Sequence, residues 1–179
     1  MGFSRCSLTA AILILVTTSI AEAGTSIDEF FGAYEGSGFV IDSGVQQGIS
    51  SERQFVLEIV PFEGEGFTIK SATTEKVPSV PNPDLMPKVW ASVMSFRPTD
   101  EIGVYDFAER GDVLTGGTLS WARISGDLLV VYRMEIDDEG IPELQIFRRT
   151  LTATGLELTF TAHRDGVTRR TVRGLYLRH

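Results

Sequence analysis

The stretch LLVVYRMEIDDEG, residues 128–140, sets the fold class of this chain. Apolar side chains recur in it at every second residue, and a period of two is the side-chain period of a β-strand. The acidic residues and the glycine that follow, at 137–140, are typical of a hairpin turn. The stretch therefore predicts a strand that turns back on an antiparallel neighbour.

Similar patterns occur on both sides of this stretch. Strands are expected upstream at residues 33–41, 53–60, 67–74, 89–97 and 102–108, and turn sequences separate further strands from Thr118 onward. About ten strands without a crossover helix are best protected by closure into a ring. We expect an all-β fold, an antiparallel up-and-down β-barrel of about 8–10 strands, with a two-sheet sandwich as the alternative. A short N-terminal helix capped by Ser26 is expected at residues 26–31.

The N-terminus has the layout of a secretory signal peptide. Arg5 precedes an apolar stretch at residues 8–20, and the triplet Ala21, Glu22, Ala23 suits cleavage before Gly24. The apolar stretch is shorter than the roughly 20 residues of a membrane-spanning helix. We therefore expect residues 1–23 to be a signal peptide and residues 24–179 to be a single soluble domain, periplasmic or secreted.

Composition limits the possible partners. The formal net charge is −8, so the chain repels phosphate backbones and anionic membranes, which argues against nucleic acid as a partner. The single cysteine, Cys6, lies within the predicted signal peptide. The domain expected after cleavage has no disulfide, and its stability has to come from its core.

Turn lengths predict which residues face one another across the C-terminal hairpins. A two-residue turn at Gly126 and Asp127, followed by three-residue turns at DEG, ATG and RDG, pairs Trp121 with Tyr132 and brings three arginines to one level of the sheet. Guanidinium groups bind carboxylate or phosphate, and aromatic neighbours reduce competition from water. The predicted ligand-binding residues, on the face assigned to the interior, are Arg123, Arg148, Arg170, Trp121, Tyr132 and Phe160.

The same register predicts an apolar outer face. It places four apolar side chains on the outside, where the N-terminal helix could cover them or a protein partner or a second copy could bind. It also allows the arginines to reach solvent or to pair with carboxylates instead of binding a ligand. The four outward side chains are Leu129, Val131, Phe147 and Leu151.

No constellation typical of catalysis occurs in the sequence. The predicted mature chain has no cysteine nucleophile, no G-x-S-x-G or H-E-x-x-H motif, and two histidines, His163 and His179. The acidic turn at 137–140 lacks the ligand spacing of a calcium loop. No catalytic residue, metal site or cofactor is therefore predicted, although carboxylate-pair catalysis remains an alternative.

The sequence resembles two groups of proteins. The stretch at residues 121–174, with FFGAYEGSG at residues 30–38, resembles uncharacterised small secreted proteins of proteobacteria. FFGAYEGSG also resembles, more loosely, the start of lipocalin and fatty-acid-binding (calycin) barrels, with Tyr34 in place of the usual tryptophan. This second resemblance implies a barrel that binds a small molecule.

These observations predict a non-catalytic exported protein that binds a small amphipathic or anionic molecule in a barrel cavity. The alternative is a structural or protein-interaction component of the cell envelope without a small-molecule ligand.

Overall fold

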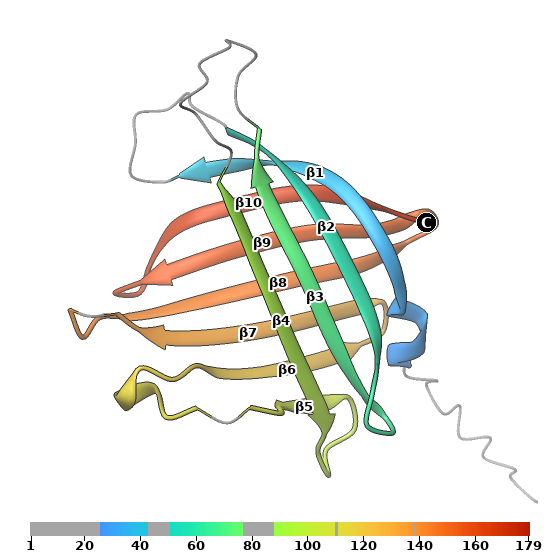
Figure 1. The fold of residues 1–179 in the computed structure, drawn as a ribbon, viewed down its shortest axis with the longest axis horizontal. Coiled ribbons are helices and arrows are strands. Elements are labelled where there is room, and N and C mark those ends of the chain that lie inside the picture. Colours follow the sequence, from blue (N-terminus) through green and yellow to red (C-terminus); the bar gives the residue numbers. More distant parts are fainter. Residues whose placement is uncertain (1–25, 43–50, 77–87, 110, 138) are drawn as a thin grey trace, which may run out of the picture.

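The computed structural model describes residues 26–42, 51–76, 88–109, 111–137 and 139–179. In these residues ten strands form a closed antiparallel barrel, and each strand pairs with the next along the chain (Figure 1). The ring closes where β1 pairs with β10. The predicted up-and-down barrel is therefore confirmed. The strands are β1 (Gly32–Asp42), β2 (Ser51–Phe62), β3 (Gly66–Glu75), β4 (Val89–Pro98), β5 (Val104–Phe107), β6 (Leu119–Ser125), β7 (Leu128–Ile136), β8 (Pro142–Thr152), β9 (Gly155–Arg164) and β10 (Val167–Arg178).

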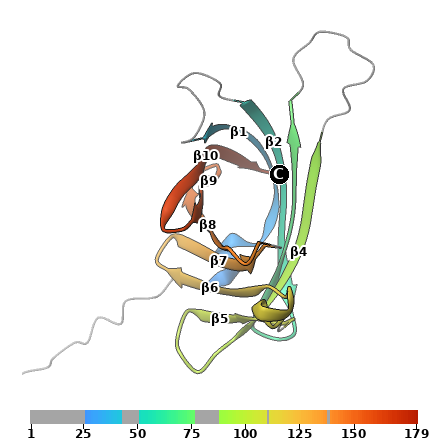
Figure 2. The ribbon, with the colours of Figure 1, turned by 90° about the vertical axis from the view of Figure 1, so that its left-hand side faces the viewer.

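The strands form two crossing walls. In Figure 1, β2, β3 and β4 run steeply in front of β6–β10. Figure 2 shows the order around the ring, from β1 and β10 past β8 and β7 to β5, with β4 at the right. A short 3-10 helix, η2 (Val113–Thr115), lies in the chain between β5 and β6. Alternate residues of each strand point into this ring.

The end of the barrel at which β1 begins is plugged. The predicted N-terminal helix is present as one 3-10 turn, η1 (Ile27–Phe30), with Ser26 as its N-cap. Phe30 is fully buried, and its carbonyl oxygen accepts a hydrogen bond of 2.7 Å from the Tyr34 hydroxyl. Arg178 Nε donates to the same hydroxyl at 3.2 Å. The predicted signal peptide, residues 1–23, lies outside the described residues.

Large side chains fill the half of the barrel next to this plug. The stacked rings of Phe67 and Phe96 have centroids 5.0 Å apart. Burial of these apolar surfaces stabilises the barrel, at roughly 25 cal/mol per Å². The largest fully buried side chains are Tyr34, Phe30, Phe67, Phe96, Leu57, Ile59, Leu129, Leu156 and Val131.

The predicted registers are right for the first two C-terminal hairpins and wrong for the last two. Tyr132 pairs with Trp121 and with Ile146, as predicted. Ile146, however, pairs with Thr161 and not with Ala162. Ala162 pairs with Arg170 and not with Thr168. The prediction therefore loses its register after β8.

Turn length explains both errors. Thr152 pairs with Gly155, so the β8–β9 turn has two residues and Gly155 already belongs to β9. A Cβ atom on Gly155 would lie 2.1 Å from the carbonyl oxygen of Tyr176, so glycine is required here for close strand approach. The last turn uses Asp165 and Gly166, with φ of 53° and 71°, which is the two-residue Asp-Gly hairpin turn. A bulge then shifts the register between Thr168 and Arg170.

The reason for Gly155 can be tested by substitution. Gly155→Ala should lower the free energy of unfolding by more than about 2 kcal/mol, because the new methyl group overlaps the β10 backbone. Gly140→Ala should cost about 1–2 kcal/mol, because Gly140 has a φ of 79° but no atom within 4 Å of its Cβ position. Urea denaturation of both variants measures the difference. Equal losses would contradict the close-approach explanation.

Candidate functional site

A cavity of about 530 Å³ lies at the end of the barrel opposite η1. Its walls come from every strand except β5 and β6. Its described lining residues include four arginines, Arg53, Arg133, Arg149 and Arg170, and no aspartate or glutamate. Because η1 and the aromatic core fill the other half of the barrel, a small molecule would enter from this end.

Strand pairing arranges one wall of the cavity in three levels. The level nearest the mouth is polar, the middle one is apolar, and the deepest carries one charge. The mouth level is Arg133, Gln145, Ala162 and Arg170, on β7 to β10 in order. The middle level is Val131, Phe147, Phe160 and Val172. The deep level is Leu129, Arg149, Leu158 and Gly174.

Arg149 is almost completely removed from solvent, with 4 % of its surface exposed. Its Nε and Nη1 atoms have no hydrogen-bond partner, and no carboxylate pairs with it, in the part of the chain that the structure describes. Its guanidinium lies 5.3 Å from the centroid of the Phe147 ring. Burial lowers the pKa of Arg149, whereas its interaction with Tyr176 acts in the opposite direction. The deep level therefore holds a guanidinium group without a counter-ion among the described residues.

Tyr176 lies beside Arg149 at the floor of the cavity. Its hydroxyl interacts with the Arg149 guanidinium, and its ring centroid lies 5.6 Å from that of Phe55. Burial raises the pKa of Tyr176, and Arg149 opposes that shift. The phenol is therefore neutral at physiological pH and can donate a hydrogen bond.

Two further cavity arginines have carboxylate partners. Arg53 Nη1 lies 3.2 Å from Glu75 Oε2, and its guanidinium lies 4.7 Å from the Trp90 ring centroid. Arg133 pairs with Glu135. In each of them one buried nitrogen still has no hydrogen-bond partner. In Arg133 this atom is Nε, and in Arg53 it is Nη1, whose contact with Glu75 lacks hydrogen-bond geometry. These two guanidinium groups are thus balanced in charge but open as donors.

The buried donors without partners converge on this cavity. In the described chain, every buried side-chain nitrogen or oxygen that lacks a hydrogen-bond partner belongs to Arg53, Arg133 or Arg149. Buried polar atoms are nearly always satisfied in folded proteins, because an unpaired one costs about 1–3 kcal/mol. A cluster of such atoms in one cavity indicates that an acceptor from outside the chain completes the site.

The structure divides the six predicted ligand-binding residues between two faces of the sheet. Phe160 and Arg170 line the cavity. The other four, on β6, β7 and β8, alternate with the inward-facing residues of these strands. They therefore point outward. The register errors after β8 produced this mixture. The outward four are Trp121, Arg123, Tyr132 and Arg148, and a ligand-binding role for them stays a prediction.

The predicted outer apolar face is also wrong. Leu129 and Val131 are buried in the core, and Phe147 and Leu151 pack against it. The sequence LLVV at 128–131 is apolar on both faces, so its pattern cannot decide which face is interior. The aromatic residues that suggested an interior instead stack outside, with the ring centroids of Trp121 and Tyr132 4.8 Å apart.

The sequence reasoning missed Arg53, Arg133, Arg149 and Tyr176. One signal was available: Arg148 and Arg149 are adjacent on a strand, so one of them faces inward in either register. A two-residue reading of the β8–β9 turn, at residues 153–154, would have placed Phe160 on the same side as Arg149. No comparable signal marked Arg53, because β2 reaches this cavity only when the ring closes between β1 and β10.

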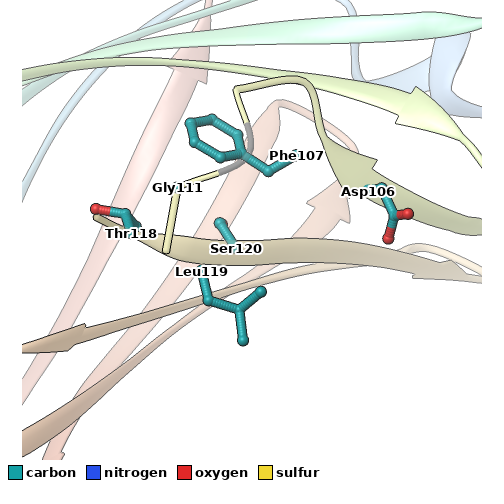
Figure 3. Close-up of a pocket in the computed structure, with 6 residues that line it drawn as sticks. All are labelled: Asp106, Phe107, Gly111, Thr118, Leu119 and Ser120. Atoms are coloured by element: carbon teal, nitrogen blue, oxygen red, sulfur yellow. The ribbon is translucent and has the colours of Figure 1, made fainter. Parts of the chain in front are cut away.

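Figure 3 shows a second cavity, of about 250 Å³, between the end of β5 and the start of β6. Leu119 points away from the ring of Phe107 in this view. Asp106 is the charged member of a lining that is otherwise neutral. The lining is Asp106, Phe107, Gly111, Thr118, Leu119 and Ser120.

The described residues contain no group of three or more His, Cys, Asp or Glu side chains placed to hold a metal ion. No helix within them has the length and apolar character needed to cross a membrane.

Comparisons with known proteins identify no family for this chain. No protein-family model matches the chain, and no curated protein matches its sequence. Among solved structures it is similar to the S-type phycobiliprotein lyase CPES from Guillardia theta, with 9% identity and a TM-score of 0.40, over 87% of this chain and 93% of that chain. A likeness of this degree does not indicate a shared ligand. The resemblance to secreted proteobacterial proteins stays a prediction.

The unfavourable burial of Arg149 predicts that an apolar replacement stabilises the barrel. The double variant Arg149→Met, Tyr176→Phe removes the charge and its hydroxyl partner together. Such replacements are often neutral or stabilising by about 1–4 kcal/mol. Urea denaturation without ligand should therefore find the double variant at least as stable as wild type. A loss above about 2 kcal/mol would show that Arg149 serves the fold.

Tyr176 should make stability depend on alkaline pH. Because its folded-state pKa is raised, the folded protein keeps a proton that the unfolded chain releases above about pH 10. Its contribution to stability is complete below that pH and is lost as pH rises through the folded-state pKa. Wild type should therefore lose more unfolding free energy than Tyr176→Phe above pH 10. Parallel curves would contradict the prediction.

Proposed function

We propose that this protein is a non-catalytic binding protein for a small amphipathic molecule with an anionic group, held in the barrel cavity. The observation that carries the proposal is the convergence of the unpartnered buried nitrogens of Arg53, Arg133 and Arg149 on that cavity. A buried charge without a partner is costly, and a bound anion would supply both the charge and the acceptors.

The middle level of the cavity supports an amphipathic ligand. Phe147 and Phe160 face each other with ring centroids 4.7 Å apart, and Val172, also in the cavity lining, flanks Phe160. Burial of an apolar segment against these side chains would contribute free energy that an inorganic anion does not gain. The cavity volume lies within the range of small-molecule sites, about 300–1,000 Å³.

The proposal includes export, with residues 1–23 as a signal peptide and a periplasmic or secreted location. The apolar part of an amphipathic molecule is unfavourably hydrated, and a cavity closed at one end would shield it from water.

An outer surface favours the second candidate, a structural or protein-interaction component of the cell envelope. Trp121 and Tyr132 stack on the outside of β6 and β7, beside Leu119, which is 44% exposed. Arg123 is exposed on the same face. Trp, Tyr and Arg are the residues enriched at protein interfaces. A second copy of the chain or another protein could therefore bind here.

Native mass spectrometry of gently purified protein tests the proposed function, with Arg149→Gln and Arg148→Gln as a matched pair. The two arginines are neighbours, but only Arg149 lines the cavity. Loss of a charge-assisted contact worth about 1.5–3 kcal/mol should lower ligand occupancy at least tenfold in Arg149→Gln. Arg148→Gln should retain the wild-type complement.

Two results would count against binding in the cavity. One is a wild-type protein without ligand even after exposure to cell-envelope extract. The other is equal retention by both variants. A ligand-free protein that forms dimers or captures one protein partner, and loses both properties in Trp121→Ala, would support the second candidate.

A further inference from the structure

The charge on the cavity walls differs between its deep level and its mouth. At the deep level Arg149 has no carboxylate partner among the described residues. The hydroxyl of Tyr176 is neutral. An anionic group with a single negative charge would therefore neutralise Arg149 at the deep level. A doubly charged group would leave one negative charge buried and unbalanced.

Two arginines at the mouth, Arg53 and Arg133, are already balanced in charge. Glu75 accompanies Arg53, and Glu135 accompanies Arg133. Arg53 Nη1 and Arg133 Nε nevertheless have no hydrogen-bond partner. These donors need an acceptor but not a charge.

The mouth also disfavours a second anion. Glu135 and Glu143 are cross-strand partners at its rim, and Glu75 lies on the facing wall. A carboxylate placed between these groups would be repelled by like charge. The hydroxyls of Ser71 and Ser92, 2.9 Å apart on that facing wall, can hydrogen-bond a neutral group.

Strand geometry sets the distance between the two levels. Gln145 at the mouth level and Arg149 at the deep level lie four residues apart on β8, about 13 Å along an extended strand. Phe147 lies between them and contacts Phe160. A ligand that satisfies both levels must cross this apolar band.

We infer that the ligand is an elongated monocarboxylic acid, with its carboxylate at Arg149 and Tyr176, an apolar middle, and a neutral oxygen acceptor at its far end facing Arg53 and Arg133. This inference rests on the proposed function and specifies its ligand. The neutral acceptor is a hydroxyl, carbonyl or amide oxygen.

A series of ten-carbon probes separates the contributions of the two ends. The probes are decanoic acid, 10-hydroxydecanoic acid, decanedioic acid and 1,10-decanediol. Isothermal titration calorimetry of each with the purified protein at neutral pH should find the hydroxy acid tightest. Decanoic acid should bind about threefold to tenfold more weakly, as for one lost neutral hydrogen bond. The diacid and the diol should each bind at least about tenfold more weakly than the hydroxy acid.

Two variants and one control show which arginine binds each end of the ligand. Arg149→Gln should weaken the three acids and leave the diol unchanged. Arg133→Gln should abolish the preference for the hydroxy acid over decanoic acid, and Arg123→Gln, on the outer face of β6, should keep it. The preference is a ratio of two affinities for one variant, so a general loss of stability does not mimic its disappearance.

The outcomes distinguish the inference from the proposed function. Tighter binding of decanedioic acid than of the hydroxy acid, or an unchanged preference in Arg133→Gln, would overturn the inference while acid binding at Arg149 still supports the proposed function. Absence of binding by every acid, or acid binding that is unaffected in Arg149→Gln, would overturn both.

Discussion

Closure of the ring between the first and last strands is the constraint on which the rest of the structure depends. Gly36 on β1 faces Tyr176 on β10, and a Cβ atom on Gly36 would lie 1.9 Å from the carbonyl oxygen of Leu175. The absence of a side chain there lets the two backbones approach and leaves interior room for the Tyr176 ring. Tyr176 then packs on Phe55 and interacts with Arg149. The cavity floor therefore depends on the same contact that closes the barrel.

The two halves of the barrel have opposite energetic roles. The half next to η1 is filled, with aromatic pairs such as Phe67 with Phe96 and a hydrogen-bonded plug of Tyr34 and Phe30. The other half contains the buried nitrogens without partners, which oppose folding. Because a domain's net stability is a small difference between large terms, the unfavourable cavity is tolerable only with the well-packed half beside it.

The sequence was sufficient for the fold class and insufficient for the site, for a physical reason. Strand alternation and turn composition are local, and they predicted the barrel and the Trp121 to Tyr132 register correctly. The interior face depends instead on the cumulative length of every turn, and one extra residue assigned at Thr152 to Gly155 exchanged the two faces of β9. Arg149 was overlooked in favour of Arg148 for another reason: LLVV at 128–131 is apolar on both faces, so alternation could not decide which face is interior. Arg53 comes to the cavity through closure of the ring, which no local pattern specifies.

The apolar band of Phe147 and Phe160 has a consequence for the timing of exchange. An acid that moves between water and Arg149 has to carry its charge past the rings of this band, which offer it no hydrogen-bond donor. For the proposed ligand the band would therefore be a kinetic barrier as well as a contact surface, and it would make residence time longer than affinity alone requires. Protonation of the acid removes the charge and lowers that barrier, so acidic surroundings would speed release without any movement of the barrel.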